Sequence, residues 1–427
     1  MNKQTIIAKR FTIGVMQIPR PADRIIRLNG MSKLIGCVTL CFIALHSAST
    51  YAEQTPPAPT AILITIGPGD APWEKYGHNM LWLRDASRGI DLCYNWGLFD
   101  FEQPGFVKNF VQGRMKYWMD AFPPGQALGA YTEQKRAVRL QLLRLTPAQV
   151  GKLIDLCEEN RKPQNAEYLY DYFKDNCSTR VRDVIASVQN DPNEFAHALR
   201  HATGSGQTYR QHALRLMQDD APLCLGIDFT LGRKCDVPLN KWDEAFLPAY
   251  LADAFAPFAD ELVKPWTASH VNVPTAAPVW WPRGLLIGVV SAGVIIFISR
   301  WKRGAIIAIT IVWGLSAFAG LFLIGMWTLT DHRAAYANQH LLQFSPLLCV
   351  GLVMLCRKSW REKVWYVAVI TIAISVLAAV LFGVIGVLNQ SNATFTALAI
   401  PLHAGAGIAA FRLRPRLTQS GVSDHGD

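Results

Sequence analysis

Metal-binding motifs are missing from this sequence. It contains no CxxC pair and no cluster of histidine and cysteine with the spacing of a zinc site. A zinc site needs such a cluster because one ion takes about four ligands, so we expect no metal and no other cofactor. Charge is also scarce: 17% of the 427 residues are charged, whereas 51% are hydrophobic. This balance excludes an ordinary water-soluble protein and indicates a membrane protein.

The excess of basic residues does not indicate a nucleic-acid partner, although the formal net charge is +10. Lysines and arginines crowd the first 33 residues, and most of the remaining excess flanks long apolar runs near the C-terminus. Cations beside apolar segments are typical of membrane proteins. We therefore expect a membrane as partner and no nucleic acid.

Residues 1–52 are predicted to form a targeting segment. Lys33 is followed by an apolar stretch at 34–44 and by small residues that end at Ala52. This order is typical of a secretory signal peptide, with cleavage after Ala52. Met31 can serve as the start, because residues 1–30 add nothing to the pattern. The domain that follows, residues 53–263, is expected to be exported.

The exported part carries an odd number of cysteines: Cys93, Cys157, Cys177, Cys224 and Cys235. In an oxidising compartment at least one of them stays free. Cys224 and Cys235 bracket a short loop and are the first candidates for a disulfide, with Cys93 and Cys157 as a second candidate pair. Cys177 would then be the free thiol.

Five apolar spans follow a Pro- and Ala-rich connector at 264–283. They cover 284–299, 305–328, 341–356, 364–388 and 395–411, where roughly 17–25 residues suffice to cross a bilayer. The connections after the first, third and fifth spans are rich in Arg and Lys. The positive-inside rule places these connections, and the tail at 412–427, in the cytoplasm. The predicted architecture is therefore an external α+β domain at 53–263 followed by five transmembrane helices within 284–411.

Cys177 opens a predicted helix. Apolar residues recur after it at positions 181, 184, 185 and 188, the spacing of one helix face, and the N-cap types Asp175 and Asn176 precede it. A thiol there lies near the positive end of the helix dipole and near unpaired backbone N–H groups, which favour the thiolate. Arg180 adds positive charge and is a candidate to contact substrate. The alternative is a packed, unreactive cysteine.

A histidine on a predicted strand supplies a base for this thiol. Residues 61–66, 77–83 and 90–96 read as consecutive strands, and His78 begins the second. A cysteine and a histidine form the minimal nucleophile–base pair, which a third group should orient. Asn95 and Asp91, both on the third strand, are the candidates, and Asn95 is preferred.

Two further segments are candidates to contact a lipid. His332, Asn338 and His340 lie in the predicted external loop between the second and third spans. They are candidates to bind a headgroup, although loop solubility also explains them. The aromatic stretch at 99–119 is either core, the commoner case, or an acyl-chain groove.

Several of these motifs resemble one family. They are Gly77-His78, the run from Asp91 through Asn95 to Phe101, the run from Tyr172 through Cys177 to Arg180, and Phe246-Leu247-Pro248. Together they resemble the bacterial envelope proteins that carry the Lnb N-terminal periplasmic domain, over roughly residues 60–255 and the multi-span tail. The resemblance implies a circularly permuted, papain-like thiol fold, akin to NlpC-type hydrolases and the lecithin:retinol acyltransferase group, in which histidine precedes cysteine.

The resemblance also implies a function. A lipoprotein N-acyltransferase of the inner membrane would move a fatty acyl chain from a phospholipid, through a Cys177 thioester, to the N-terminal cysteine amine of a diacylated lipoprotein. Two alternatives stay open. The same thiol and histidine could cut peptidoglycan peptides as an amidohydrolase, although five spans are more than an anchor requires. The chain could also be a non-enzymatic envelope scaffold.

Overall fold

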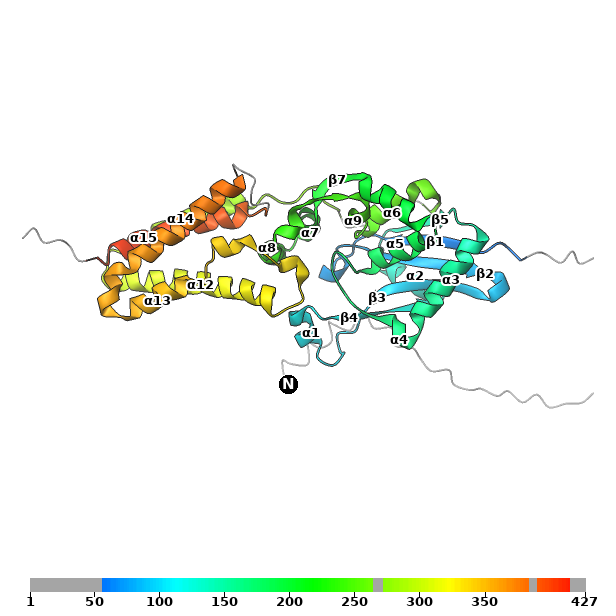
Figure 1. Cartoon of the computed structure of the whole chain (residues 1–427), viewed down its shortest axis with the longest axis horizontal. Helices are drawn as coiled ribbons and strands as arrows, with labels where there is room; N and C mark the ends of the chain where they lie inside the picture. The colour runs from blue at the N-terminus through cyan, green and yellow to red at the C-terminus, as the bar shows by residue number, and fades with distance from the viewer. Residues whose placement is uncertain (1–55, 264–271, 384–389, 415–427) are drawn as a thin grey trace, which may run out of the picture.

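The computed structural model describes residues 56–263, 272–383 and 390–414. The targeting segment predicted at 1–52 lies outside the described residues, as do most of the tail and part of the connector. Figure 1 shows an N-terminal domain built on a sheet at one end of the molecule and a helical region at the other. The α1 and α8 helices lie between the two.

A seven-stranded antiparallel sheet forms the centre of the N-terminal domain, in the order β6-β4-β3-β2-β1-β5-β9. Its strands are β1 (Thr60–Ile66), β2 (His78–Asp85), β3 (Ile90–Leu98), β4 (Lys116–Phe122), β5 (Val138–Leu143), β6 (Glu167–Leu169) and β9 (Ala259–Val263). The α+β class is confirmed. The strands predicted at 61–66, 77–83 and 90–96 are also confirmed: β1 is a strongly apolar run, and a turn at Gly89 (φ 65°) separates β2 from β3.

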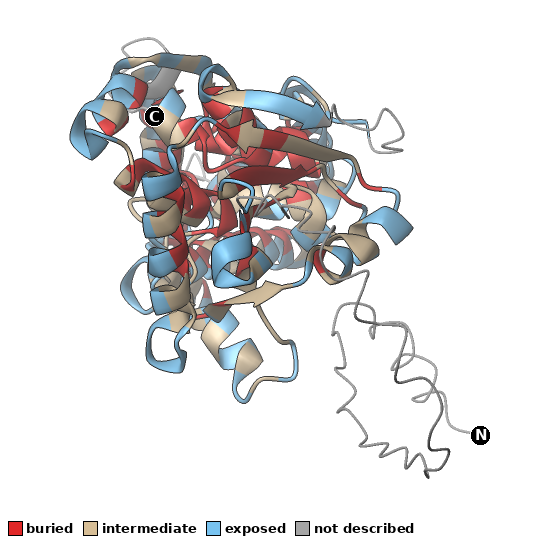
Figure 2. Cartoon of the chain, turned by 90° about the vertical axis from the view of Figure 1, so that its right-hand side faces the viewer, coloured by how far each residue is buried: buried red, intermediate tan, exposed pale blue. Residues whose placement is uncertain are grey.

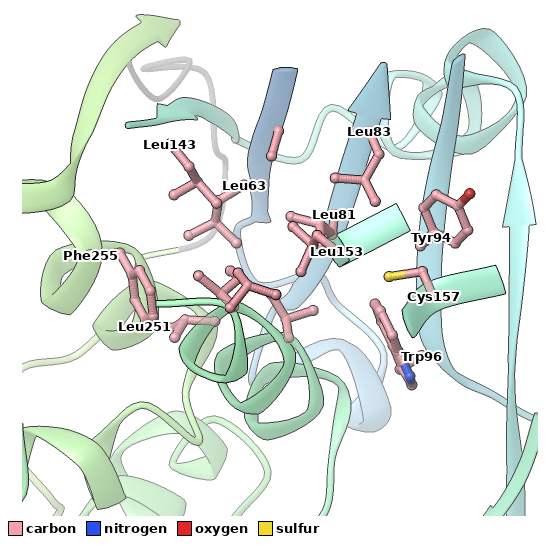
Figure 3. Close-up of a cluster of buried hydrophobic side chains, with 14 of the residues drawn as sticks. Leu63, Leu81, Leu83, Tyr94, Trp96, Leu143, Leu153, Cys157, Leu251 and Phe255 are labelled. Atoms are coloured by element: carbon pink, nitrogen blue, oxygen red, sulfur yellow. The ribbon is translucent and has the colours of Figure 1, made fainter. Parts of the chain in front are cut away.

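Helices cover both faces of this sheet. On one face α3 (Pro147–Arg161), α5 (Cys177–Ser187) and α10 (Pro248–Phe255) enclose the main core, which includes Leu63, Leu81 and Trp96 (Figure 3). On the other face α2 (Pro124–Glu133) covers a second cluster around Ile64, Met80 and Cys93. Figure 2 shows that the buried residues gather in the strands and in the helix faces against them. Successive side chains of β2 and β3 point to opposite faces of the sheet, so the register of each strand fixes which side chains face which layer of helices.

The remaining helices and strands of the N-terminal domain are short. They are α1 (Phe106–Gln112), α4 (Pro163–Ala166), α6 (Pro192–His201), β7 (Thr203–Thr208), α7 (Tyr209–Met217), α8 (Ala221–Thr230), β8 (Pro238–Asn240) and α9 (Lys241–Glu244). A buried charge cluster ties α7 and α8 to the short 3-10 helix that ends at Asp236. Arg210 on α7 lies 2.8 Å from a carboxylate oxygen of Asp228 on α8 and 2.8 Å from one of Asp236, and its side chain is 1% exposed.

Neither candidate disulfide forms: all five cysteines of the N-terminal domain are free. Cys93 and Cys157 cannot meet, because Cys93 belongs to the cluster on the α2 face of the sheet and Cys157 to the core on the opposite face. Cys224 and Cys235 also lie in different clusters, and their thiols contact the carbonyl oxygens of Leu214 and Ala334 respectively. Short separation in sequence did not bring their side chains together.

Four helices of the C-terminal region are long and apolar enough to cross a membrane in the part of the chain that the structure describes. They are α11 (Trp281–Ile298), α12 (Lys302–Thr328), α14 (Val364–Gly383) and α15 (Ala393–Phe411). The third predicted span, 341–356, is wrong as a full-length helix. Only α13 (Leu348–Cys356), of 9 residues, is helical there, which is about 14 Å at 1.5 Å per residue.

The backbone ahead of α13 is irregular and packs against α12. A Cβ on Gly320 would lie 2.1 Å from the carbonyl oxygen of Phe344 and 2.8 Å from Cδ of Pro346. Only glycine allows this approach, and the proline prevents the helix from starting earlier. Non-helical backbone at membrane depth is tolerated where protein surrounds it, and Gln343 in this segment is fully buried.

Candidate active site

The predicted cysteine and histidine meet at one end of the sheet. His78 is the first residue of β2, and the antiparallel strand β3 ends beside it. Cys177 is the first residue of α5, whose later turns pack on the sheet through Val181 and Ile185. The prediction that Cys177 opens a helix and lies on its buried side is confirmed, because α5 begins at Cys177 and this residue is only 9% exposed.

Gly97 at the end of β3 makes room for this meeting. A Cβ on Gly97 would lie 3.3 Å from Cβ of Cys177 and 3.9 Å from Cε1 of His78. The residue also has φ +91°, a conformation that side chains with a Cβ avoid. A larger residue here would push the thiol away from the imidazole.

Asn95 is placed to orient His78, and Asp91 is not. His78 Nε2 lies 2.7 Å from Asn95 Oδ1, and Asn95 is 7% exposed. With Nε2 donating to Asn95, Nδ1 is the ring nitrogen left for the thiol. Asp91 pairs with Arg84 in the β2–β3 register and accepts a hydrogen bond from Trp82 Nε1 at 2.7 Å. Six residues of β2 separate Arg84 from His78, about 20 Å of strand.

The two groups of the pair shift each other toward the ionised form. Burial opposes ionisation of Cys177, but the positive charge and hydrogen bond of His78, with the backbone N–H groups of Asn79 and Ser178, outweigh it and lower the pKa of the thiol. Burial likewise opposes protonation of His78, but Cys177 and the hydrogen bond to Asn95 raise the pKa of the imidazole. Each group of the pair therefore favours the ionised form of the other.

The N-cap of α5 binds backbone N–H groups at the helix start, which the sequence analysis expected to be unpaired and to favour the Cys177 thiolate. Asn176 Oδ1 accepts the backbone N–H groups of both Ser178 and Thr179, each at 2.9 Å. Its side-chain amide donates to the carbonyl oxygens of Tyr172 and Phe246 at 3.0 Å. Asn176 therefore fixes the start of the helix, and the N–H groups of Ser178 and Thr179 each already have an acceptor.

Asn79 and Ser178 hold the thiol-bearing helix against the histidine-bearing strand. Ser178 Oγ lies 2.8 Å from Asn79 Oδ1, and Asn79 Nδ2 donates to Thr65 Oγ1 at 2.9 Å. Both residues are completely buried. The sequence analysis assigned no role to either residue. The only signal in the sequence was that a polar residue directly follows each reactive residue: Asn79 follows His78, and Ser178 follows Cys177.

Tyr168 supplies a hydroxyl at the site. Its oxygen would lie 3.9 Å from a Cβ on Gly97, next to Cys177, and it is buried with no hydrogen-bond partner within the described residues. Burial and the nearby Cys177 raise the pKa of this phenol, so it stays protonated and can donate. Arg180, a predicted substrate contact, covers the Tyr168 ring at 4.1 Å and is held by Asp175, with its NH2 group at 2.7 Å.

The three loop residues predicted to contact a headgroup have different environments. His332 stacks on the ring of Tyr172, with centroids 6.2 Å apart, and is half-buried. Asn338 and His340 are buried, at 2% and 0% exposure, and contact the last carbonyls of α8: each approaches Phe229 O, at 2.8 and 3.0 Å. The structure therefore does not bring Asn338 and His340 to an accessible surface.

Within residues 56–263, 272–383 and 390–414, no three or more His, Cys, Asp or Glu side chains are grouped to hold a metal ion.

Two family models match the chain. The model described as the Lnb N-terminal periplasmic domain matches residues 48–212, and the one described as the Lnb transmembrane domain matches residues 277–411. No curated protein and no solved structure matches. The matches identify a periplasmic N-terminal domain, which carries the site, and a multi-span membrane domain.

Proposed function

The chain belongs to the Lnb family, and from that premise we propose that it is a lipoprotein N-acyltransferase. It takes a fatty acyl chain from a phospholipid and passes it to the N-terminal cysteine amine of a diacylated lipoprotein. One observation carries the proposal: a thiol whose pKa is lowered by a histidine, in turn hydrogen-bonded to an asparagine, lies in a domain joined to a membrane bundle.

In the first half-reaction the Cys177 thiolate attacks the ester carbonyl of the phospholipid. A bond forms between sulfur and the carbonyl carbon, and the ester oxygen leaves with the electron pair of the broken C–O bond. The His78 imidazolium protonates that oxygen. The products are a Cys177 thioester, a lysophospholipid and a neutral His78, as expected of covalent catalysis by an activated thiol.

In the second half-reaction the lipoprotein amine attacks the thioester carbonyl. Neutral His78 accepts a proton from the amine as the C–N bond forms, and the C–S bond breaks to release the thiolate. The amide product leaves, and the thiolate and imidazolium are regenerated. Asn95 holds the ring so that the same nitrogen serves both steps.

The negative oxygen of each tetrahedral intermediate needs a hydrogen-bond donor. The amides of Ser178 and Thr179 are bound by Asn176, so we assign this role to the Tyr168 hydroxyl, which is buried, protonated and unpartnered. Removing one such donor typically costs about 10²–10³ in rate.

The proposal includes the kinship of the domain to circularly permuted, papain-like thiol enzymes. The chain order supports it, since His78 on a strand precedes Cys177 at a helix start.

The test follows the acyl chain. Full-length protein in vesicles is incubated with a phospholipid labelled in its acyl chain, and then with a diacylated lipopeptide. We expect label first on the Cys177 peptide and then on the lipopeptide amine. Cys177→Ala should abolish both, whereas Cys356→Ala, at an exposed cysteine of the membrane domain, should change neither. Label on the Cys177→Ala protein, or new free amines in cell-wall sacculi without lipopeptide acylation, would disprove the proposal.

A further inference from the structure

Eight aromatic side chains form a closed circuit between the site and the membrane domain. Each ring contacts the next, with centroids 4.2–6.5 Å apart, in the order Phe99, Phe101, Phe106, Phe110, His332, Tyr172, Tyr170, Tyr117 and back to Phe99. We call these eight residues the aromatic collar. They come from five separate chain segments, so only the tertiary structure assembles them.

The collar is not part of the hydrophobic core. None of its members is buried, and Phe101, Phe110 and Tyr172 are 46%, 51% and 46% exposed. On α1 the neighbouring Val107 and Val111 are 72% and 59% exposed. The expectation that this aromatic stretch is mainly core is therefore wrong for these rings. Contiguous exposed apolar side chains mark a surface that contacts another apolar body.

The position of α1 identifies the apolar body that this surface meets. Asp331, three residues beyond the end of α12, donates its backbone N–H to Gln112 O at 2.8 Å, and Arg114 bonds its carboxylate at 2.6 Å. A Cβ on Gly113 would lie 2.8 Å from the His332 backbone nitrogen, so the chains are in close contact. These contacts hold α1 beside the end of α12 (Figure 1). Because α12 is a span of the membrane domain, α1 lies at the outer surface of the bilayer.

The opposite side of the collar reaches the thiol. Tyr117 pairs with Tyr168 in the β4–β6 register, and the Tyr168 hydroxyl lies beside Cys177. Tyr170 and Tyr172 lead directly into the cap of α5. Partial desolvation raises the pKa of the Tyr170 phenol, and the nearby Cys177 raises it further. The collar therefore spans from the bilayer surface to the reactive sulfur.

Exposed cations flank the membrane side of the collar. Lys108 lies on α1 and Arg333 follows His332, and both are exposed. No ion pair holds either side chain in the part of the chain that the structure describes. An apolar surface with free cations at the bilayer interface complements a lipid that has acyl chains and an anionic phosphate.

We propose that the aromatic collar is the site that accepts one acyl chain of an outer-leaflet phospholipid and leads its ester to Cys177. This rests on the proposed function for the chemistry that follows, but not for the binding itself. The exposed faces of the rings pack along the methylene groups of the acyl chain where that chain leaves the bilayer. Lys108 and Arg333 then face the phosphate that remains at the interface.

The first experiment compares two acyl donors on full-length protein in phosphatidylglycerol-containing vesicles. One donor is a vesicle phospholipid and the other is p-nitrophenyl acetate, which has no chain for the collar to hold. With Phe101→Ala and Phe110→Ala, acylation of Cys177 by the phospholipid should fall about 10- to 100-fold per ring, as expected for lost apolar contacts. Acylation by the acetate should not change. Phe258→Ala, a similarly exposed phenylalanine (44%) outside the collar, is the matched control.

Unchanged phospholipid acylation, or equal losses with both donors, would overturn the proposal. A second measurement separates it from the proposed function. In a Cys177→Ala protein, which cannot form a thioester, p-benzoylphenylalanine replaces Phe110 or Phe258. Photolysis should crosslink position 110, and not 258, to vesicle phospholipid. Crosslinking at position 110 without acyl transfer by the wild type would disprove the proposed function but support lipid binding by the collar. The absence of a crosslink at position 110 would disprove lipid binding by the collar alone.

Discussion

The Asn95–His78 hydrogen bond gives the sharpest test of the site, through Asn95→Ala. The bond is 2.7 Å long, Asn95 is 7% exposed, and the bond raises the pKa of the partner ring and so favours the charged imidazolium. Hydrogen bonds to charged groups contribute about 1.5–3 kcal/mol, and each 1.36 kcal/mol is tenfold in rate. We therefore expect kcat/KM for transfer from phospholipid to lipopeptide to fall roughly 10- to 150-fold.

The pH dependence supplies a second, independent reading of the same variant. The ionised pair needs a deprotonated Cys177 thiol and a protonated His78 imidazole, so loss of the proton from His78, whose pKa is raised, limits the rate at alkaline pH. Asn95 is one of the groups that raise the pKa of His78. Its loss lowers that pKa, so the alkaline limb of the rate profile should move to lower pH.

Asp91→Ala is the matched control, because Asp91 was the rival candidate on the same strand. It pairs with Arg84 at 3.6 Å, where both side chains are more than half exposed, so its removal should leave rate and pH profile unchanged. The assay measures acylated lipopeptide by mass spectrometry at several pH values. Equal losses in the two variants, or none in Asn95→Ala, would refute the assignment of Asn95.

Three further changes and one condition test the surroundings of the site. Tyr168→Phe keeps the ring but removes the unpartnered hydroxyl; kcat should fall about 10²–10³-fold while the thiol still reacts with iodoacetamide, as expected for a lost oxyanion donor. Gly97→Ala places a Cβ 3.3 Å from that of Cys177 at φ +91°, so both alkylation of Cys177 and transfer should slow. Arg210→Ala leaves two buried carboxylates unpaired and should cost about 3–5 kcal/mol of stability, measured as a lower melting temperature. The control is Arg88→Ala, which removes a surface ion pair whose side chains are 37% and 67% exposed and should cost about 1 kcal/mol or less. Because every described cysteine is free, a reducing agent should leave the melting temperature unchanged, and a clear decrease would contradict the structure.

The local pattern of the sequence determined the elements that carry the chemistry. A strongly apolar run is sufficient to predict β1, and the N-cap Asn176 with a one-face apolar stripe is sufficient to place Cys177 at a helix start. The start of α3 carries a signal of the same local kind, a capping box in which Thr146 and Gln149 satisfy each other within one turn. Such signals depend only on neighbours in the chain, so the sequence contains them completely.

Tertiary structure decided everything that depends on how these elements meet. Register chose Asn95 over Asp91, since both lie on β3 and only their distance from His78 differs. Opposite faces of the sheet kept Cys93 from Cys157. Packing of Phe344 against Gly320 made the third apolar span a short helix, although its composition matched a full one. Composition and periodicity do not encode these contacts, because each joins side chains from elements that only the fold places together.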